Sequence, residues 1–251
     1  MTDRLPKQIS IQRLAERLHA GVGLTRYSAV EFLIALVALL VVTPLVENLR
    51  HAVLIEGLLL TVVLGSAVLA VGAERRTLMI AAALSFPALL SKWVHHFAPE
   101  FVPVEVFLIA GIAFIGFVLF NLLRFILSAS KVDTEVLCAG IATYLTLGLL
   151  WAFAYLLVSR ATPHAFSFTG STDKHVLTGF DTLYFSYVTL STVGFGDITP
   201  VSPAARMLAV LEALTGTIYL AVLVARLVSM HSGTTQQSQP EAVQPASESR
   251  P

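Results

Sequence analysis

Six long hydrophobic runs, separated by short polar or charged segments, dominate the pattern of hydrophobic and polar positions along this chain. Each run is close to the ~20 consecutive apolar residues that an α-helix needs to cross the hydrocarbon core of a bilayer. The predicted spans are residues 28–47, 53–73, 77–95, 104–125, 135–158 and 203–229. The fifth is the clearest, because no charged residue lies between Glu135 and Arg160. The third is the weakest, because it contains Pro87 and runs into Lys92. The pattern predicts an all-α membrane protein.

Composition strengthens the assignment to a lipid bilayer. The chain has 251 residues, of which 56% are hydrophobic and 13% charged, and its mean hydropathy is +0.79. Its formal net charge is zero, so nothing suggests a nucleic acid or another polyanion as a partner. Cys138 is the only cysteine, which leaves no intrachain disulfide. The polar and charged start of the chain gives no indication of a removable signal peptide.

The distribution of Lys and Arg between the predicted loops indicates an orientation. With the N-terminus in the cytoplasm, the inner segments contain Arg4, Lys7, Arg13, Arg17, Arg26, Arg75, Arg76, Arg124 and Lys131. The outer segments contain Arg50, Lys92, Arg160 and Lys174. This excess on one side follows the positive-inside rule for six spans with both termini in the cytoplasm. With the compact loops, it predicts a protein of a bacterial inner (plasma) membrane.

One segment between the fifth and sixth spans, residues 189–197, is too polar and too rich in glycine to cross a bilayer as a helix. Irregular backbone survives at membrane depth only where it is buried in protein or lines water. Rings of backbone carbonyls can replace the water shell of a potassium ion. Pointing consecutive carbonyls at one axis requires a backbone of alternating hand. Gly194 and Gly196 supply this freedom at alternate positions, with Val193 and Phe195 between them.

Residues 192–197, Thr-Val-Gly-Phe-Gly-Asp, resemble the signature selectivity filter of the tetrameric potassium channel family. The filter positions implied by this resemblance are Thr192, Val193, Gly194, Phe195, Gly196 and Asp197, with K+ bound at the first four. Because one strand supplies one oxygen to each ring, a closed cage needs several copies, so a homotetramer is expected. Phe195 replaces the more usual tyrosine, but the carbonyl oxygens rather than that ring would coordinate the ion. No cofactor is implied beyond K+ as the permeant ion.

The segment before the filter, residues 180–190, has the length of a short re-entrant helix. Asp181 suits its N-terminal end, where a side-chain oxygen can cap free N–H groups. The expected filter supports are Tyr184, Phe185, Tyr187, Val188 and Thr189, and the three aromatic residues are predicted to form a cuff around the filter. Tryptophans are frequent at these positions in the family, and we expect the Tyr184 hydroxyl to reach Asp197 in place of an indole donor. Val188 replaces a glutamate of some bacterial relatives, so their filter inactivation is not carried over.

The resemblance divides the chain into four parts. They are a cytoplasmic N-terminal segment (1–27), a four-helix transmembrane domain (28–128), a potassium channel pore domain (129–231) and a disordered cytoplasmic tail (232–251). A voltage sensor requires several arginines at every third position, since each charge moved gains only ~2.3 kcal/mol per 100 mV. The fourth span runs from Val106 to Leu123 without a charged residue. We therefore expect no intrinsic voltage gating, and the role of the first four spans stays open.

Two residues in the sixth span are gating candidates. Glu212 is an acidic residue within a span, which marks a functional position by default, and it would face the region behind the filter or bond to a neighbouring subunit. Gly216, one turn later, is either a hinge, as in similar channels, or a small residue that allows close helix packing. His95 and His96 are either a pH or metal sensor or ordinary interfacial histidines. The gating stimulus is left open.

The sequence thus predicts a potassium-selective channel that conducts K+ passively through a homotetrameric pore, and not an enzyme. A nonselective cation channel of the same architecture and a nonconducting, channel-modulating subunit are the alternatives. A transporter with four related glycine loops is disfavoured because this chain has one such loop. An intramembrane protease is disfavoured because neither Gly-x-Ser-x-Gly nor His-Glu-x-x-His occurs.

Overall fold

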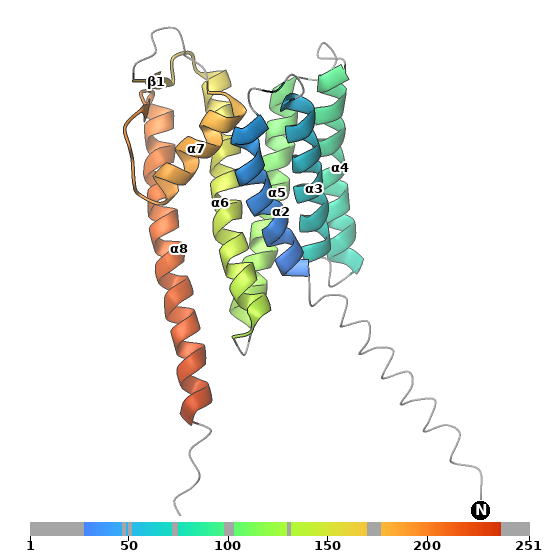
Figure 1. Ribbon diagram of the computed structural model, residues 1–251, viewed down its shortest axis with the longest axis vertical. Helices are drawn as coiled ribbons and strands as arrows, with labels where there is room; N and C mark the ends of the chain where they lie inside the picture. Colours follow the sequence, from blue (N-terminus) through green and yellow to red (C-terminus); the bar gives the residue numbers. More distant parts are fainter. Residues whose placement is uncertain are drawn as a thin grey trace, which may run out of the picture.

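The computed structural model describes residues 28–46, 49, 52–71, 75–97, 103–129, 132–169 and 177–236. The predictions for the N-terminal segment 1–27 and for residues 237–251 of the tail lie outside the described residues, as do the side chains of His95 and His96. Within the described ranges most of the chain is helical, and the exceptions lie mainly around the predicted filter (Figure 1).

The helices follow the predicted spans. They are α2 (Ser28–Val46), α3 (Ala52–Val71), α4 (Arg75–Phe97), α5 (Val104–Ser128), α6 (Thr134–Ala161), α7 (Gly179–Leu190) and α8 (Pro203–Gln236). Asp133 caps α6 by accepting a hydrogen bond from the Val136 N–H at 2.9 Å. Pro203 opens α8, where its missing N–H costs no helical bond. Helix α4 continues through Pro87 to Phe97, so the weakest predicted span is a helix as well.

Four of the described helices are long and apolar enough to cross a membrane. The apolar spans are Ala29–Val46 in α2, Val104–Ser128 in α5, Thr134–Ala161 in α6 and Pro203–Ser229 in α8. The apolar parts of α3 and α4, Leu54–Ala70 and Arg76–Leu90, are shorter. The all-α membrane class is therefore confirmed, whereas the crossing of the bilayer by α3 and α4, and with it the total of six spans, stays a prediction.

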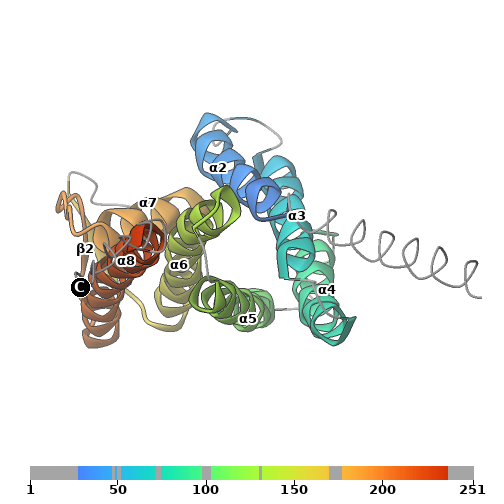
Figure 2. The same ribbon diagram turned by 90° about the horizontal axis from the view of Figure 1, so that it is seen from below.

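Helices α2 to α6 form a ring in which α6 is shared with the rest of the chain. Each helix contacts the next along the sequence, and α2 closes the ring against α6. Figure 1 shows the long helices running side by side, and Figure 2 shows the ring from one end. Helices α7 and α8 pack on the other side of α6 and against each other. Helix α6 therefore determines where the filter segment lies relative to the ring.

Two clusters of buried side chains hold these helices together. The larger lies within the ring and includes Phe107 of α5 and Phe153 of α6, whose ring centroids are 5.5 Å apart. The smaller joins Tyr155 of α6, Phe185 of α7 and Phe166, which follows α6 in the chain, with edge-to-face rings at centroid distances from 4.8 to 5.8 Å. Edge-to-face packing is a favoured aromatic geometry, so this cluster orients α7 on α6.

A short antiparallel ladder joins the loop that follows α6 to the loop that precedes α8. Strand β1 (Phe166–Phe168) pairs with β2 (Ile198–Pro200), with Phe166 opposite Pro200 and Phe168 opposite Ile198. The sequence did not predict it, because three residues carry too little periodicity to indicate a strand. The ladder ties the segment after the filter to the segment after α6.

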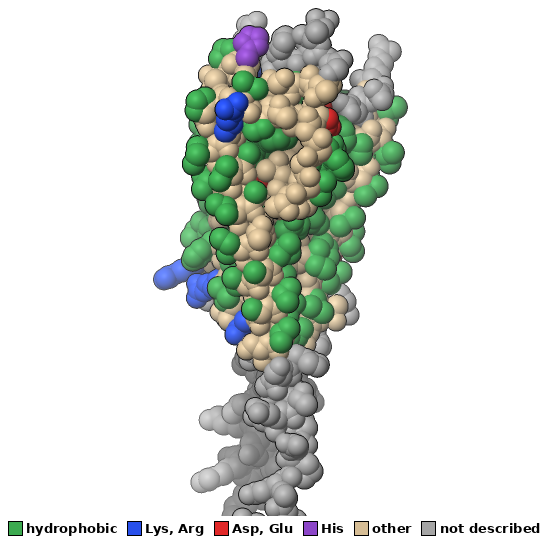
Figure 3. Space-filling model, turned by 90° about the vertical axis from the view of Figure 1, so that its left-hand side faces the viewer, with side chains coloured by type: hydrophobic (Ala, Val, Ile, Leu, Met, Phe, Trp, Pro, Cys, Tyr) green, Lys and Arg blue, Asp and Glu red, His purple; other side chains and the backbone are tan. Residues whose placement is uncertain are grey.

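Helix α8 is the least buried of the four apolar helices. Only 11% of its apolar span is buried inside the chain, compared with 50% for α6. Its exposed large hydrophobic residues include Met207, Leu211, Leu214, Ile218 and Val222. Figure 3 shows hydrophobic side chains along this side of the molecule, with basic side chains toward its upper and lower ends. A face of this kind needs a hydrophobic covering, from lipid or from another chain.

Candidate functional site

The segment predicted as the filter joins α7 to β2 with a backbone of alternating hand. The φ angle is positive at Thr192 (60°), Gly194 (56°) and Gly196 (79°), but not at the intervening Val193 and Phe195. Glycine adopts this hand freely, whereas an L-residue such as threonine pays roughly 1–2 kcal/mol for it. This is the alternation that a row of carbonyl oxygens around one axis requires. The two glycines predicted this alternation, and the positive φ angle of Thr192 extends it to one further residue.

The first residues of the filter are held by the last turn of α7. The N–H groups of Val193 and Gly194 both donate to the carbonyl oxygen of Val188, at 3.0 and 3.3 Å. The Thr192 N–H donates to the carbonyl oxygen of Thr189 at 2.9 Å. Val188 and Thr189 thus contact the predicted filter through their backbone oxygens, and their role as filter supports stays a prediction. Three consecutive N–H groups bound to one helix end explain how Thr192 is kept in a strained conformation.

The other end of the filter is held by a tyrosine of α7 and by the residue after β1. The Tyr184 hydroxyl donates to Asp197 Oδ2 at 2.8 Å, which confirms the predicted contact, and its ring stacks on Phe195. The hydrogen bond to Asp197 raises the pKa of Tyr184, which lies outside the four apolar spans. Thr169 donates from its N–H to Asp197 O at 2.8 Å and from its hydroxyl to Gly196 O at 3.1 Å.

Of the three residues predicted to form an aromatic cuff, the single chain places only Tyr184 against the predicted filter, and the cuff itself stays a prediction. Tyr184 contacts the filter, but Phe185 is only 5% exposed and packs within the smaller core cluster. Tyr187 donates its hydroxyl to the carbonyl oxygen of Leu145 in α6, and its ring fills the space where Gly148 has no Cβ. Tyr184 and Tyr187 are three positions apart and share one side of α7, whereas Phe185 points about 100° away from Tyr184. Phe185 and Tyr187 instead anchor α7 to α6.

The N-terminal end of α7 is closed by a capping box. Helix α7 begins at Gly179, one residue before the predicted start, and Thr178 is its N-cap. Asp181 Oδ2 accepts hydrogen bonds from the N–H and the hydroxyl of Thr178, at 3.0 and 2.6 Å. Asp181 therefore stabilises this end, as expected, but from the third helical position rather than as the cap itself.

The filter segment is open to its surroundings in the single chain. Residues 191–197 are all exposed, and Phe195 is 70% exposed. Among the described residues, no group of three or more His, Cys, Asp or Glu side chains is placed to hold a metal ion. A cation at this segment would therefore be held by backbone and threonine oxygens, which are suitable ligands for a dehydrated alkali ion.

Glu212 of α8 is fully buried and joins three helices behind α7. Its Oε2 accepts a hydrogen bond from the Tyr155 hydroxyl of α6 at 2.5 Å, and its Oε1 lies 2.5 Å from the Ser186 hydroxyl of α7. The Ser186 hydroxyl also lies 2.7 Å from the carbonyl oxygen of Gly148 in α6. Within this chain Glu212 therefore occupies the first of its two predicted environments. The sequence did not single out Tyr155 or Ser186, because nothing local indicates that these positions meet.

Comparison with known proteins decides the family. A family model described as ion channel matches residues 140–232. Protein LctB of Bacillus caldotenax is 37% identical over 102 residues, which cover 39% of this chain and 74% of that protein. The inward rectifier potassium channel Kirbac3.1 of Paramagnetospirillum magnetotacticum is 35% identical over 83 residues, or 32% of this chain. Two-pore potassium channel 4 of Arabidopsis thaliana is 36% identical over 89 residues, or 35% of this chain.

This chain belongs to the potassium channel family. It is thus an integral membrane ion channel and not an enzyme. The chain spans 24% of the length of Kirbac3.1 and 30% of the Arabidopsis channel, so the likeness concerns a part of those proteins. No solved structure matches the channel.

Gly216 of the channel lies one turn after Glu212 and touches the end of α7. A Cβ at this position would collide with the carbonyl oxygen of Leu190 and lie 2.9 Å from Leu190 Cδ1. Helix α8 runs without a break through this position. This contact supports the interpretation that Gly216 allows close packing of α8 against α7. A hinge at Gly216 stays a prediction.

A contact near the other end of α8 ties this helix to the ring. Arg226 Nη2 donates to the carbonyl oxygens of Leu127 and Ala129, both at 2.9 Å. These two oxygens lie at the C-terminal end of α5, where the partial negative charge of a helix favours a cation. The sequence does not indicate these partners, because they lie about a hundred positions before Arg226.

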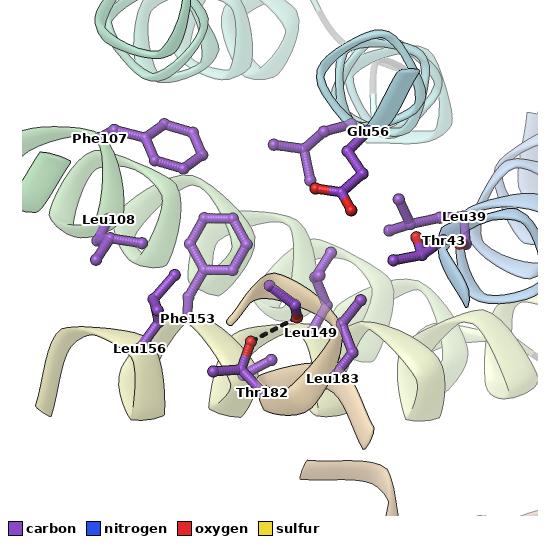
Figure 4. Close-up of a pocket in the computed structure, with 13 residues that line it drawn as sticks. Leu39, Thr43, Glu56, Phe107, Leu108, Leu149, Phe153, Leu156, Thr182 and Leu183 are labelled. Carbon is purple, nitrogen blue, oxygen red and sulfur yellow. Dashed lines mark hydrogen bonds between the residues drawn. The ribbon is translucent and has the colours of Figure 1, made fainter. Parts of the chain in front are cut away.

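The ring and α7 also meet at a cavity of about 110 Å³. Its walls are mostly apolar and come from α2, α3, α5, α6 and α7 (Figure 4). Glu56 of α3 turns its carboxylate into this space, and a Cβ on Gly179 would lie 3.7 Å from Glu56 Oε2. Negative charge beside the N-terminus of a helix is favourable. Glu56 therefore links the ring electrostatically to the start of α7.

Proposed function

We propose that the channel conducts potassium selectively and passively as a homotetramer, with residues 192–197 as its selectivity filter. The observation that carries the proposal is the alternation of φ at Thr192, Gly194 and Gly196 between two anchored ends. The K+ sites would use the oxygens of Thr192, Val193, Gly194 and Phe195. Helix α7 would be the re-entrant pore helix, with its C-terminal partial negative charge toward the ion path.

The surfaces that are exposed in a single chain support an assembly of four copies. One strand contributes one oxygen to each ring, so a closed cage needs further copies around an axis. The filter segment is exposed, as is a hydrophobic face of α8, and Figure 1 shows the loop between α7 and α8 beside α8 at the same edge of the molecule. Burying both between four copies would cover the apolar side chains and place the filter strands at the centre.

We further propose that voltage does not gate this channel by itself. Between Val104 and Leu123, the only charged residue of α5 is Glu105 at its start, and Arg124 follows near its end. A sensor made of regularly spaced arginines is thus missing from this helix. Glu212 and Gly216 are the gating candidates, because both hold α8 against α7. The positive-inside rule supports cytoplasmic termini, and the compact loops support a bacterial inner membrane.

Potassium flux into liposomes that hold the purified channel tests this function. Gly194→Ala introduces a Cβ at φ +56° with no neighbour within 4 Å, so it disturbs backbone conformation without a steric clash. Its matched control is Gly116→Ala in α5, where an added Cβ also meets nothing within 4 Å. We expect Gly194→Ala and the more severe Gly194→Asp to lose flux and Gly116→Ala to keep it.

Four other outcomes would contradict the proposal. Equal flux from the wild type and Gly194→Asp would argue that ions do not pass this segment. Equal permeation of sodium and potassium would favour the nonselective cation channel. An assembled protein without flux would favour the nonconducting subunit, and native mass spectrometry that finds a monomer in the membrane would exclude the carbonyl cage.

A further inference from the structure

The hydrogen bonds around Glu212 need one proton more than an ionised carboxylate allows. Three contacts between oxygens link Tyr155 to Glu212, Glu212 to Ser186, and Ser186 to the carbonyl of Gly148, at 2.5, 2.5 and 2.7 Å. Each contact needs one hydrogen, each hydroxyl supplies one, and the carbonyl supplies none. Two hydroxyls therefore serve only two of the three contacts. A proton on Glu212 Oε1 completes the set, because the acid then donates to Ser186 and Ser186 donates to Gly148.

The surroundings of Glu212 also favour the neutral acid. Its side chain is fully buried, and within the described part of the chain no Lys, Arg or His forms an ion pair with it. The titratable groups that face it are Tyr144 and Tyr155 of α6 and Tyr187 of α7, which are uncharged phenols at neutral pH. A buried carboxylate without a counter-charge is so costly that it takes up a proton instead.

We propose that Glu212 is held as a protonated acid and acts as a positioning residue for the filter. Its proton closes a chain of hydrogen bonds that fixes α7 between α6 and α8, and loss of this proton at alkaline pH releases α7. The effect on conduction rests on the function proposed above, whereas the presence of the proton does not.

The position of Ser186 connects this chain of hydrogen bonds with the filter. Ser186 precedes Val188 in the same helical turn, and the Val188 carbonyl oxygen accepts the N–H groups of Val193 and Gly194. A helix that shifts at Ser186 would therefore shift the oxygen that holds the start of the filter.

Helix α8 supports the last part of α7 at two points on one face. Glu212 contacts Ser186, and Gly216, four residues later and hence on the same side of the helix, contacts Leu190. With Glu212 ionised, Ser186 can donate to either the carboxylate or Gly148, and one contact between acceptors is left unbonded. The conducting state is thus expected to lose stability as pH rises.

Infrared difference spectroscopy of the reconstituted full-length channel tests the proton directly. The wild type is expected to show the carbonyl band of a protonated carboxylic acid at neutral pH, which declines at alkaline pH. Glu212→Gln should lack this band, and Glu105→Gln, which changes an exposed carboxylate of α5, should retain it. If no band at neutral pH depends on Glu212, the carboxylate is ionised and the proposal is wrong, whether or not potassium flows.

Potassium flux at different pH values tests the positioning role. An amide at this position donates from its NH2 to Ser186 and accepts from Tyr155, so Glu212→Gln should conduct like the neutral wild type and lose the alkaline decline. Glu212→Ala leaves the Tyr155 hydroxyl without its acceptor and Ser186 without its donor, and it is expected to lower flux about tenfold at every pH. Ser186→Ala, a second route if Glu212→Ala does not assemble, should lower flux and keep the infrared band.

Two results separate this inference from the proposed function. A wild type that shows the Glu212 band but carries no potassium would contradict the proposed function and leave the proton in place. A Glu212→Gln variant whose flux falls with pH as in the wild type would show that the alkaline effect arises elsewhere, and the positioning role would be abandoned.

Discussion

The Tyr184 hydroxyl donates a hydrogen bond to the carboxylate of Asp197 at 2.8 Å, so the residue that ends the filter is tied to the middle of α7. The start of the filter is tied to the same helix through the carbonyl oxygen of Val188. Both ends of the filter thus depend on where α7 lies. Helix α7 in turn depends on its contacts with α6, α8 and the ring, and each of these contacts leads to a prediction.

Tyr184→Phe is expected to lower the selectivity for potassium over sodium, because it releases Asp197 while the ring can still stack on Phe195. The cost in folding free energy should be about 1 kcal/mol or less, since the hydrogen bond is exposed. Reversal potentials in mixed potassium and sodium solutions measure the first effect, and thermal unfolding the second. The control is Tyr219→Phe. It removes a hydroxyl of α8 that donates to Gly140 O of α6 at 2.7 Å, away from the filter segment. An equal loss of selectivity in both variants would contradict a specific role of Tyr184.

The same hydrogen bond predicts a pH dependence. Because Asp197 raises the pKa of Tyr184 in the folded protein, the stabilisation is complete below the ordinary tyrosine pKa. It is lost only as pH rises through the raised value. Selectivity measured in the Glu212→Gln background, which removes the titration of Glu212, should therefore stay constant through the ordinary tyrosine range. A decline within that range would show that Asp197 does not hold the tyrosine proton.

Gly216→Ala should destabilise the channel by about 1–3 kcal/mol, because the added methyl group collides with the Leu190 carbonyl at the end of α7. Gly65→Ala in α3 meets no atom within 4 Å and should be neutral or stabilising by about 0.5–1 kcal/mol. Thermal unfolding in detergent compares the two variants. If Gly216→Ala changes flux without lowering stability, the hinge interpretation of Gly216 would be favoured over close packing.

Arg226→Met should loosen the contact between α8 and the end of α5. It removes two hydrogen bonds from a charged donor to the carbonyl oxygens of Leu127 and Ala129, with an expected cost of about 1–3 kcal/mol. Hydrogen exchange should increase in the last turn of α5. Arg76→Met, which changes an exposed arginine of α4, should leave exchange there unchanged. Equal exchange in all three proteins would show that α8 is held to the ring by other contacts.

Glu56→Gln should weaken the link between α3 and the start of α7, because the negative charge beside the N-terminus of α7 is lost. The expected cost is about 0.3–1 kcal/mol at low ionic strength, and it should shrink as salt is added. Thermal unfolding across a salt series measures it. Glu31→Gln, which changes an exposed carboxylate in the first turn of α2, provides the matched control. A loss of stability that does not depend on salt would argue for a packing effect instead.

Much of the channel could be predicted where the signal is local. Continuous hydrophobic runs indicated α2, α5, α6 and α8, because a span needs only length and low charge. The alternation of glycines indicated the backbone of the filter, because glycine alone adopts the left-handed region without cost. Tyr184 and Asp197 could be paired because both belong to one short motif of known form.

Predictions failed or stopped where a side chain could turn to more than one neighbour. Phe185 and Tyr187 are aromatic residues of the kind expected in a filter cuff, but in the folded chain they pack on α6, and the sequence of α7 does not show where its neighbouring helices lie. The β1–β2 ladder is too short to leave a pattern. The hydrogen-bond partners of Arg226 belong to the end of α5, about a hundred positions earlier in the chain, where no local pattern points to them.

The sequence by itself indicated a membrane channel and predicted the segment proposed as its filter, because hydrophobic length and glycine spacing are properties of consecutive residues. Only the tertiary structure decided how the filter is held. Glu212 meets Tyr155 from 57 positions away and Ser186 from 26, and only the packing of α6, α7 and α8 brings them together. The count of protons among these oxygens, and with it the charge of Glu212, follows from that packing.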